Sequence, residues 1–367
     1  MNHDHTNNST IDPKISSHYE KILIEEEYRN EFYQLLEKVL TSNYLAQGPV
    51  VMEFEKLFSE LSGMYATSTS SGSGALYAVL NYIDIKNYDV IIPTFSCVSI
   101  PLTVMNAGGN VIFADCNKND MCICLDTIKS VLTPATKAVI VIHASGHIAF
   151  DIVQIANFCK KQNIALIEDC CHADGATYLG RYPGAFGLGG IFSFHASKLL
   201  PVGEGGMFVS KKKKVTEYVE KFKNYGHIYN HSKKKYIPTG FNLCLGEISA
   251  ALGIIQLQRR NDILKWKQIL AQRYDKIFSQ RISLPKGMIS SNYKYVVFDS
   301  GIINTAGKLF NTSKGGRLSH ELLGHEGFFP VSSWIAKNHH NIPIFYGSEL
   351  SRKNDLELKK YFLGGKE

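Results

Sequence analysis

The sequence lacks several features that would place the protein in a specialised class. No stretch approaches the roughly 20 apolar residues of a transmembrane helix, and residues 1–8 are polar where a signal peptide would carry an apolar segment. The eight cysteines include Cys122 with Cys124 and the adjacent Cys170 and Cys171. These spacings suit neither a zinc site nor a small disulfide scaffold. Together the absences predict a reduced, cytoplasmic protein without a membrane partner.

Signals for nucleic-acid binding and for several common enzyme classes are also missing. The net charge of +7 is modest, and the lysine runs at 211–214 and 233–235 contain no interleaved aromatic residues. No Walker loop, dinucleotide fingerprint or Ser-His-Asp arrangement is evident. We therefore expect an ordinary globular protein, 44% hydrophobic and 20% charged, with a small-molecule partner and no nucleic acid.

The middle of the chain alternates between strand-like and helical patterns. Apolar runs predict strands at 89–93, 110–115, 138–144, 163–169 and 190–194, and helical segments such as 74–83 and 152–161 lie between them. Repeated strand–helix–strand units with continuous apolar strands predict an α/β fold. Its sheet is expected to be mainly parallel and covered on both faces.

The two ends of the chain differ from this middle part. Residues 1–14 are predicted to be a disordered tail. A long helical pattern runs over about 246–278, followed by a strand candidate at 293–298 and a helix candidate at 318–323. We place a domain boundary inside that helix, which gives a large domain over 15–260 and a smaller C-terminal α+β domain over 261–367.

Lys198 is the most informative residue. It follows an apolar run, precedes the glycine-containing turn Gly203–Gly206, and lies 29 residues after the acidic strand end Glu168-Asp169. A lysine at a strand exit beside a neighbouring carboxylate suits pyridoxal phosphate chemistry. The amine forms a Schiff base and the carboxylate keeps the pyridine nitrogen protonated. A lysine taken alone is most often a solvated surface residue, so the neighbouring motifs decide.

Two of these motifs follow early strands. The first, at residues 70–76, contains Gly72 and Ser73 and opens a helix, so its small residues and its amides favour an anion. The alternative is a Ser/Gly linker that caps the helix. The second places Phe95 at the end of a buried strand, where an aromatic ring can stack on a planar cofactor. The alternative is that Phe95 packs in the core.

The other motifs lie around and after the acidic strand end. Asp169 and His172 place a carboxylate beside a ring donor, and Glu168 is expected to point to the opposite side of the strand. Metal binding is the competing interpretation, but one carboxylate with one histidine makes a poor site, so we predict no metal. Asn242 stands just before the long helix, where an N-cap role is the alternative to ligand binding.

Taken in order, these motifs resemble the DegT/DnrJ/EryC1/StrS family of pyridoxal-phosphate sugar aminotransferases. The resemblance covers about residues 20–280 and includes 45–51, 71–76, Thr94-Phe95, 168–172, 192–198, 203–206 and 240–257. Ser73 stands where a threonine is commoner in the family. The C-terminal third resembles the family's small domain only loosely.

The resemblance implies a type I pyridoxal-phosphate transferase fold with a seven-stranded sheet. It implies that Lys198 is the Schiff-base lysine, Asp169 the pyridinium partner, and His172 a neighbour of the cofactor's 3-hydroxyl. Gly72, Ser73 and Ser193 would bind the phosphate and Phe95 would stack on the ring. Asn242 would reach the phosphate of the other subunit in a homodimer, and His227 is a weaker candidate for the sugar site.

The implied function is transamination, EC class 2.6.1, from L-glutamate to a nucleotide-linked keto-sugar in amino-sugar and polysaccharide biosynthesis. One alternative is a sugar dehydratase of the same family. Such enzymes carry histidine where Lys198 stands, so the lysine argues against them. Another is a non-catalytic regulatory protein with this fold, which the presence of Lys198, Asp169 and Ser193 together disfavours.

Overall fold

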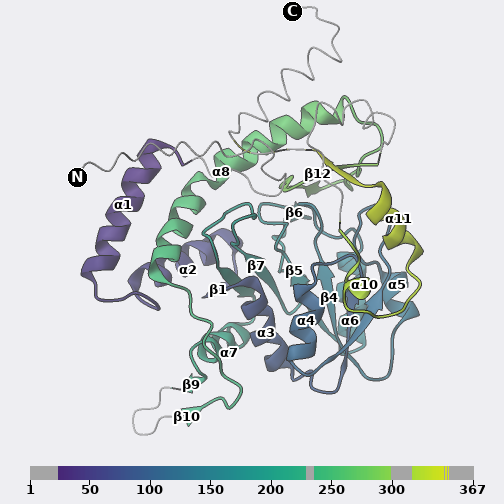
Figure 1. Ribbon diagram of the computed structural model, residues 1–367, viewed down its shortest axis with the longest axis horizontal. Helices are drawn as coiled ribbons and strands as arrows, with labels where there is room; N and C mark the ends of the chain where they lie inside the picture. Colours follow the sequence, from purple (N-terminus) through teal and green to yellow (C-terminus); the bar gives the residue numbers. More distant parts are fainter. Residues whose placement is uncertain (1–23, 229–234, 299–315, 343, 345, 347–367) are drawn as a thin grey trace, which may run out of the picture.

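The computed structural model describes residues 24–228, 235–298, 316–342, 344 and 346. A seven-stranded sheet in the order β1-β8-β7-β5-β4-β2-β3 forms its centre (Figure 1). In that order the strands are Tyr65–Thr69, Gly206–Ser210, Gly189–Ser193, Ala165–Asp169, Thr136–Ile142, Asp89–Pro93 and Asn110–Ala114. All neighbouring pairs are parallel except the two that contain β8. The predicted mainly parallel, seven-stranded α/β sheet is thereby confirmed.

Helices cover both faces of the sheet because consecutive strand residues point in opposite directions. Ala138 and Ile140 of β4 pack with the helices α3 (Gly72–Ile83), α4 (Ser99–Asn106) and α7 (Lys213–Lys223). Val139 and Val141 of the same strand pack on the other face with α5 (Leu125–Ser130) and α6 (Ile152–Lys161). These residues of β4, which face either side, are therefore apolar, as a doubly covered sheet requires.

Near β7 and β8, the second face is covered by α2 (Pro49–Ser62) and by the first half of α8 (Glu247–Asp275). Phe54 and Phe58 of α2 pack edge-to-face on Phe194, and Phe58 also on Phe192. The helix α1 (Glu26–Thr41) lies along α8 on the outer side (Figure 1).

The second half of α8 packs on a separate apolar cluster. Tyr274, together with Phe278 beyond the helix end, contacts β12 (Tyr295–Val297) and β13 (His340–Ile342), which pair with each other. The helices α10 (Ser319–Leu322) and α11 (Pro330–Asn338) lie instead at the ends of β2 and β3, where Ser319 N donates to Thr94 O at 2.9 Å and Ser332 N donates to Asp115 at 2.7 Å. The strand and helix expected at 293–298 and 318–323 are thus present, while the boundary at residue 260, inside α8, stays a prediction.

Three short strand pairs lie outside these layers: β6 (Thr177–Tyr178) with β11 (Met288–Ile289), and β9 (His227–Ile228) with β10 (Lys235–Tyr236), besides β12 with β13. Across the described part of the chain, the model contains no helix with the length and apolarity that a membrane span needs. The tail predicted over 1–14 lies outside the described residues.

Two strands of the central sheet were not predicted, β1 and β8. Thr67, Ser68 and Thr69 make up most of β1, and all three are fully buried although they are polar. Burial of such a strand depends on partners elsewhere in the chain, which an apolar pattern does not reveal. The predicted turn at 203–206 ends where β8 begins, at Gly206.

Candidate active site

The candidate catalytic lysine lies beside the candidate carboxylate because two parallel strands end together. Asp169 is the last residue of β5, Ser193 is the last residue of β7, and Asp169 is in register with Ile191. Lys198 follows in the turn after β7, where its N–H donates to His195 O at 2.8 Å. Burial by itself lowers the pKa of Lys198, but the electrostatic influence of Tyr293, Cys171 and Asp169, in that order of size, raises it above its ordinary value.

Asp169 and Glu168 point to opposite faces of the sheet, as the strand geometry predicts. The Asp169 side chain is 5% exposed and accepts a hydrogen bond from Cys171 N at 2.9 Å. Glu168 is fully buried and accepts from the backbone N–H groups of Gly184, Phe186 and Gly187 at 2.7–2.8 Å. The two acids therefore differ in role: Asp169 faces the site, whereas Glu168 anchors the loop before β7.

His143 is a further hydrogen-bond partner of Glu168, the residue before Asp169. Its Nδ1 accepts a hydrogen bond from Ala149 N at 3.1 Å, so the ring proton lies on Nε2 and is donated to Glu168 at 3.0 Å. The Cys170 thiol is close enough to form a ligand-like group with these two residues. However, it donates to Glu168 O, and burial raises its pKa well above the ordinary value. Internal hydrogen bonds account for this cluster, and we assign it a supporting role.

His172 stacks on Tyr293, with ring centroids 4.4 Å apart and the planes inclined by 28°. Burial lowers the pKa of His172 well below its ordinary value, and the charges of Lys198 and Lys294 lower it further, so the ring is neutral. The Tyr293 hydroxyl donates to Ser197 O at 2.9 Å. Tyr293 therefore fixes both the histidine and the turn that carries Lys198.

The turn after β1, residues 70–74 (the glycine-rich turn), lies next to the end of β7. Ser71 is the N-cap of α3, and its Oγ accepts a hydrogen bond from Gly74 N at 3.0 Å. A Cβ at Gly72 would lie 3.2 Å from the Ser193 Cβ and 3.3 Å from Phe192 O, so glycine permits this approach. The turn therefore brings the N-terminus of α3 and Ser193 together, a combination suited to a phosphate group. Ser73 is exposed on the same turn.

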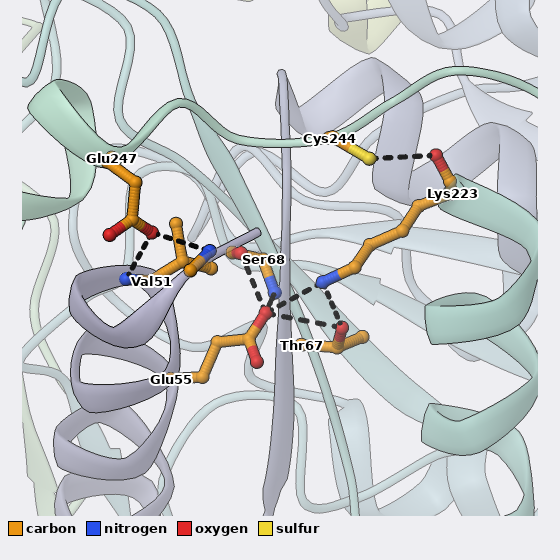
Figure 2. A network of polar contacts seen from close by, with 8 residues as sticks. Val51, Glu55, Thr67, Ser68, Lys223, Cys244 and Glu247 are labelled. Atoms are coloured by element: carbon orange, nitrogen blue, oxygen red, sulfur yellow. Dashed lines mark hydrogen bonds and ion pairs between the residues drawn. The ribbon is translucent and has the colours of Figure 1, made fainter. Parts of the chain in front are cut away.

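A buried ion pair holds β1, the strand that leads into this turn (Figure 2). Glu55 of α2 accepts hydrogen bonds from Ser68 N and Oγ and from Lys223 Nζ, all at 2.7 Å. Lys223 Nζ also donates to Thr67 Oγ1 at 2.9 Å. The Lys223 side chain is 1% exposed, so removal of one partner would leave the other charge uncompensated away from water.

The same network fixes the segment that carries Asn242. Lys223 O accepts hydrogen bonds from Leu243 N at 2.8 Å and from Cys244 Sγ at 3.4 Å, and Leu243 O accepts from Ser70 N at 2.7 Å. Next in the chain, the fully buried Glu247 accepts from backbone N–H groups at the start of α2, including Val51 N at 2.9 Å (Figure 2). The segment 241–247 is thereby tied to the glycine-rich turn and to α2.

These features fit pyridoxal phosphate. A carboxylate, an ammonium group, a neutral histidine and a glycine-permitted turn at a helix N-terminus are the groups that its ring, aldehyde and phosphate require. The sequence model of the DegT/DnrJ/EryC1/StrS aminotransferase family matches residues 26–298. The chain belongs to this family. Pyridoxal phosphate is accordingly its cofactor.

Named relatives of this family agree. The GDP-perosamine synthase of Escherichia coli O157:H7 is 32% identical over 265 residues, 71% of this chain and 70% of that protein. The dTDP-4-dehydro-2,3,6-trideoxy-D-glucose 4-aminotransferase of Saccharopolyspora spinosa is 28% identical over 281 residues, 71% of this chain and 73% of that protein.

Solved structures show the same fold. The aminotransferase TlmJ from Streptoalloteichus hindustanus superimposes with a TM-score of 0.82 at 24% identity, covering 93% of this chain and 97% of that one. A putative sugar aminotransferase from Streptococcus pneumoniae, Spr1654 in its PMP form, superimposes with a TM-score of 0.83 at 19% identity and the same coverage. The type I transferase fold is thus confirmed.

Phe95 lies at the end of β2, as predicted. Its ring is partly buried, packs against the core cluster of α5 and α6, and meets His339 edge-to-face with the centroids 5.4 Å apart. Both the stacking and the packing interpretation are compatible with this placement. The stacking of the Phe95 ring on the cofactor of this aminotransferase family member stays a prediction.

Asn242 and His227 lie apart from the other predicted residues. Asn242 is exposed and forms an isolated β-bridge with Asn224. His227 belongs to β9, where its ring packs edge-to-face on Tyr236 at 4.6 Å. The contacts described here place neither side chain beside Lys198, so their assignments to a partner's cofactor and to the sugar site stay predictions.

Tyr293 and Lys294 are site residues that the sequence analysis missed. Both belong to a segment that we assigned only as a strand candidate. Lys198 Nζ lies 5.6 Å from the centroid of the Tyr293 ring. No local pattern connects residues about one hundred positions apart, and the contact is made by Tyr293, just before β12, whose hydroxyl reaches the turn after β7.

Proposed function

We propose that the protein is an aminotransferase that transfers the amino group of L-glutamate to a nucleotide-linked keto-sugar. The observation that carries this proposal is the meeting of Lys198 and Asp169 at adjacent strand ends, beside neutral His172 and the turn at Gly72. The relatives named for GDP-perosamine and for a dTDP-linked sugar support the substrate class. We also propose that the enzyme is a cytoplasmic homodimer in a polysaccharide or amino-sugar pathway.

Each residue has a chemical task in this proposal. Bound pyridoxal phosphate supplies an electron sink for the bond at the substrate's amine-bearing carbon. Asp169 holds a proton on the pyridine nitrogen, and the N-terminus of α3 with Ser193 holds the phosphate. Lys198 takes the proton from that carbon as a general base and returns it as a general acid. Its location in the turn fixed by Tyr293 keeps the amine within reach.

A spectroscopic experiment tests the reaction. Purified enzyme loaded with pyridoxal phosphate should lose the absorbance of the lysine-bound cofactor on addition of L-glutamate, with stoichiometric release of 2-oxoglutarate. Nucleotide-linked 3-keto and 4-keto sugars, tested as a panel, should restore the absorbance. If glutamate and other amino acids leave the spectrum of the loaded enzyme unchanged, the aminotransferase proposal is wrong.

Mixing two variants tests the homodimer and the role of Asn242. Under the proposal, Lys198→Ala and Asn242→Ala each impair every site of their own homodimer. A mixed dimer contains one site with Lys198 from one chain and Asn242 from the other, both intact. Activity should therefore reappear when the two variants are unfolded and refolded together. Activity that equals only the sum of the separate variants would contradict the shared site.

A further inference from the structure

Lys294 is a second lysine beside the catalytic one. Lys198 Nζ and Lys294 Nζ lie 5.6 Å and 5.8 Å from the centroid of the Tyr293 ring. The backbone of Lys294 is fixed, because its N–H donates to Ser145 O at 2.9 Å in the turn after β4. The neighbouring Ser291 and Ser290 both donate to Gly146 O. The position of this lysine beside Lys198 is thus built into the fold.

Lys294, which is half-buried, differs from three buried cations in having no acceptor. Lys223 is paired with Glu55, Arg260 with Asp174, and Lys267 donates to Ile344 O at 2.7 Å. In the described parts of the chain, no hydrogen bond or ion pair reaches the Lys294 ammonium group. Burial lowers its pKa, and the charge of Lys198 lowers it further. A half-buried ammonium group without a protein acceptor keeps its hydrogen-bonding capacity for water or for a ligand.

The space beside Lys294 can admit a polar ligand. A cavity of about 630 Å³ is lined by Lys294, by Ser145, His147, Ser290 and Asn292, and by residues of α8. Among its described lining residues the one carboxylate is Asp275, which already binds Arg281 and accepts from the Tyr295 hydroxyl, each at 2.8 Å. Apart from the Asp275–Arg281 pair, Lys294 is the one charged group among the described lining residues, whose other members are neutral polar or apolar, and an unneutralised cation there favours an anion.

We propose that Lys294 binds an anionic oxygen group of a substrate while Lys198 reacts with it. Resting on the function proposed above, the inference names a carboxylate of the amino donor or the diphosphate of the sugar nucleotide. The two sources share one chemistry, a charge-assisted hydrogen bond to an oxyanion. A donor carboxylate is the source we expect, because it lies few bonds from the nitrogen that replaces Lys198.

The test compares Lys294→Met and Lys294→Arg with a matched control, Lys286→Met, which removes an exposed lysine before β11. Loaded enzyme is titrated with maleate, an unreactive dicarboxylate, and both half-reactions are followed by stopped flow. Lys294→Met should weaken maleate binding and slow the glutamate half-reaction at low substrate on the order of 10- to 100-fold, the effect of one charged hydrogen bond. Lys294→Arg should retain most of both, and Lys286→Met should match the wild type.

The outcomes are distinguishable. A loss in the glutamate arm assigns the carboxylate, and a loss confined to the sugar arm assigns the diphosphate. Equal rates and maleate affinities in Lys294→Met and the wild type would overturn the inference. Lys294→Met should also melt at the same temperature as the wild type or higher, since it removes an unpaired charge, whereas a structural lysine would give a lower value. If the wild type itself ignores glutamate but binds maleate through Lys294, the proposed function fails and the anion site stands.

Discussion

The polar groups on the two sides of Lys198 are satisfied in different ways. On the side of Asp169 and the glycine-rich turn, the Glu168 carboxylate accepts hydrogen bonds from four donors, and Glu55 forms an ion pair with Lys223. On the side of Tyr293, Lys294 has no acceptor among the described residues and borders a cavity. A cofactor that stays bound is served by a preorganised site, whereas a substrate that comes and goes must supply the missing partner itself.

The largest expected effect comes from the residue between these two sides. Lys198→Ala removes the amine that we propose moves the proton, so kcat should fall roughly 10⁴-fold. The measurement is single-turnover conversion with glutamate, accompanied by circular dichroism to show that the fold is intact. A loss of less than tenfold in folded, loaded enzyme would assign the proton transfer to another group.

Removing the Glu168 carboxylate should destabilise the folded protein on the side of Asp169. Glu168→Ala leaves three backbone N–H groups and the His143 Nε2–H without their acceptor in a fully buried place. The free energy of unfolding in urea should fall by about 4 kcal/mol. Glu168→Gln, which keeps the shape and one acceptor oxygen, should lose less. Equal losses in the two variants would contradict the hydrogen-bond account.

The ion pair behind the glycine-rich turn offers a smaller perturbation. Lys223→Met leaves the Glu55 carboxylate without its cation and should cost about 3 kcal/mol of unfolding free energy. The double variant with Glu55→Leu should recover much of that loss, because it removes the unpaired charge as well. Lys221→Met, an exposed lysine on the same helix, serves as the control. A double variant no more stable than Lys223→Met would show that packing, and not charge, dominates.

The smallest expected effect is on the pH dependence of stability, through Asp120 and through His147, which lines the cavity. Burial raises the pKa of Asp120 from 3.8 to about 6, so its contribution to stability is lost as the pH rises through that range. Burial lowers the pKa of His147 from 6.5 to about 4, and this contribution is lost as the pH falls. The two oppose each other. In Asp120→Asn, acidification from pH 6 to pH 4 should therefore cost about 2 kcal/mol more unfolding free energy than in the wild type.

Urea unfolding at both pH values measures this difference. Asp126→Asn, at an exposed position on α5, should show the wild-type pH dependence. A variant Asp120→Asn with an unchanged pH dependence would mean that the Asp120 carboxyl titrates normally in the folded protein.

Much of the architecture could be predicted from the sequence, and the exceptions share a cause. The apolar strands β2, β4 and β5 have a pattern that burial on two faces dictates. In contrast, β1 is polar, and it is buried because Glu55 and Lys223 supply partners from two other elements. Its burial is therefore a property of the assembled fold.

The same distinction applies to the site. Asp169, His172, Ser193 and Lys198 belong to two short segments, and their order along the chain was enough to predict that they meet. Tyr293 and Lys294 reach Lys198 from the segment just before β12, about a hundred positions later. That proximity arises from tertiary contacts such as the hydrogen bond from the Tyr293 hydroxyl to Ser197 O, so no local motif indicates it.

The long helix α8 connects the segment that carries Asn242 with the strand β12, which directly follows Lys294. Its first residue, Glu247, caps α2 and follows the segment that carries Asn242, while Asp275 at its last residue binds Tyr295 of β12. With 29 residues the helix is about 43 Å long. A tilt of about 5° around its first turn would displace its far end by about 4 Å over that length. Because of this length, a small rotation of the helix at the end near Asn242 would translate the strand beside Lys294.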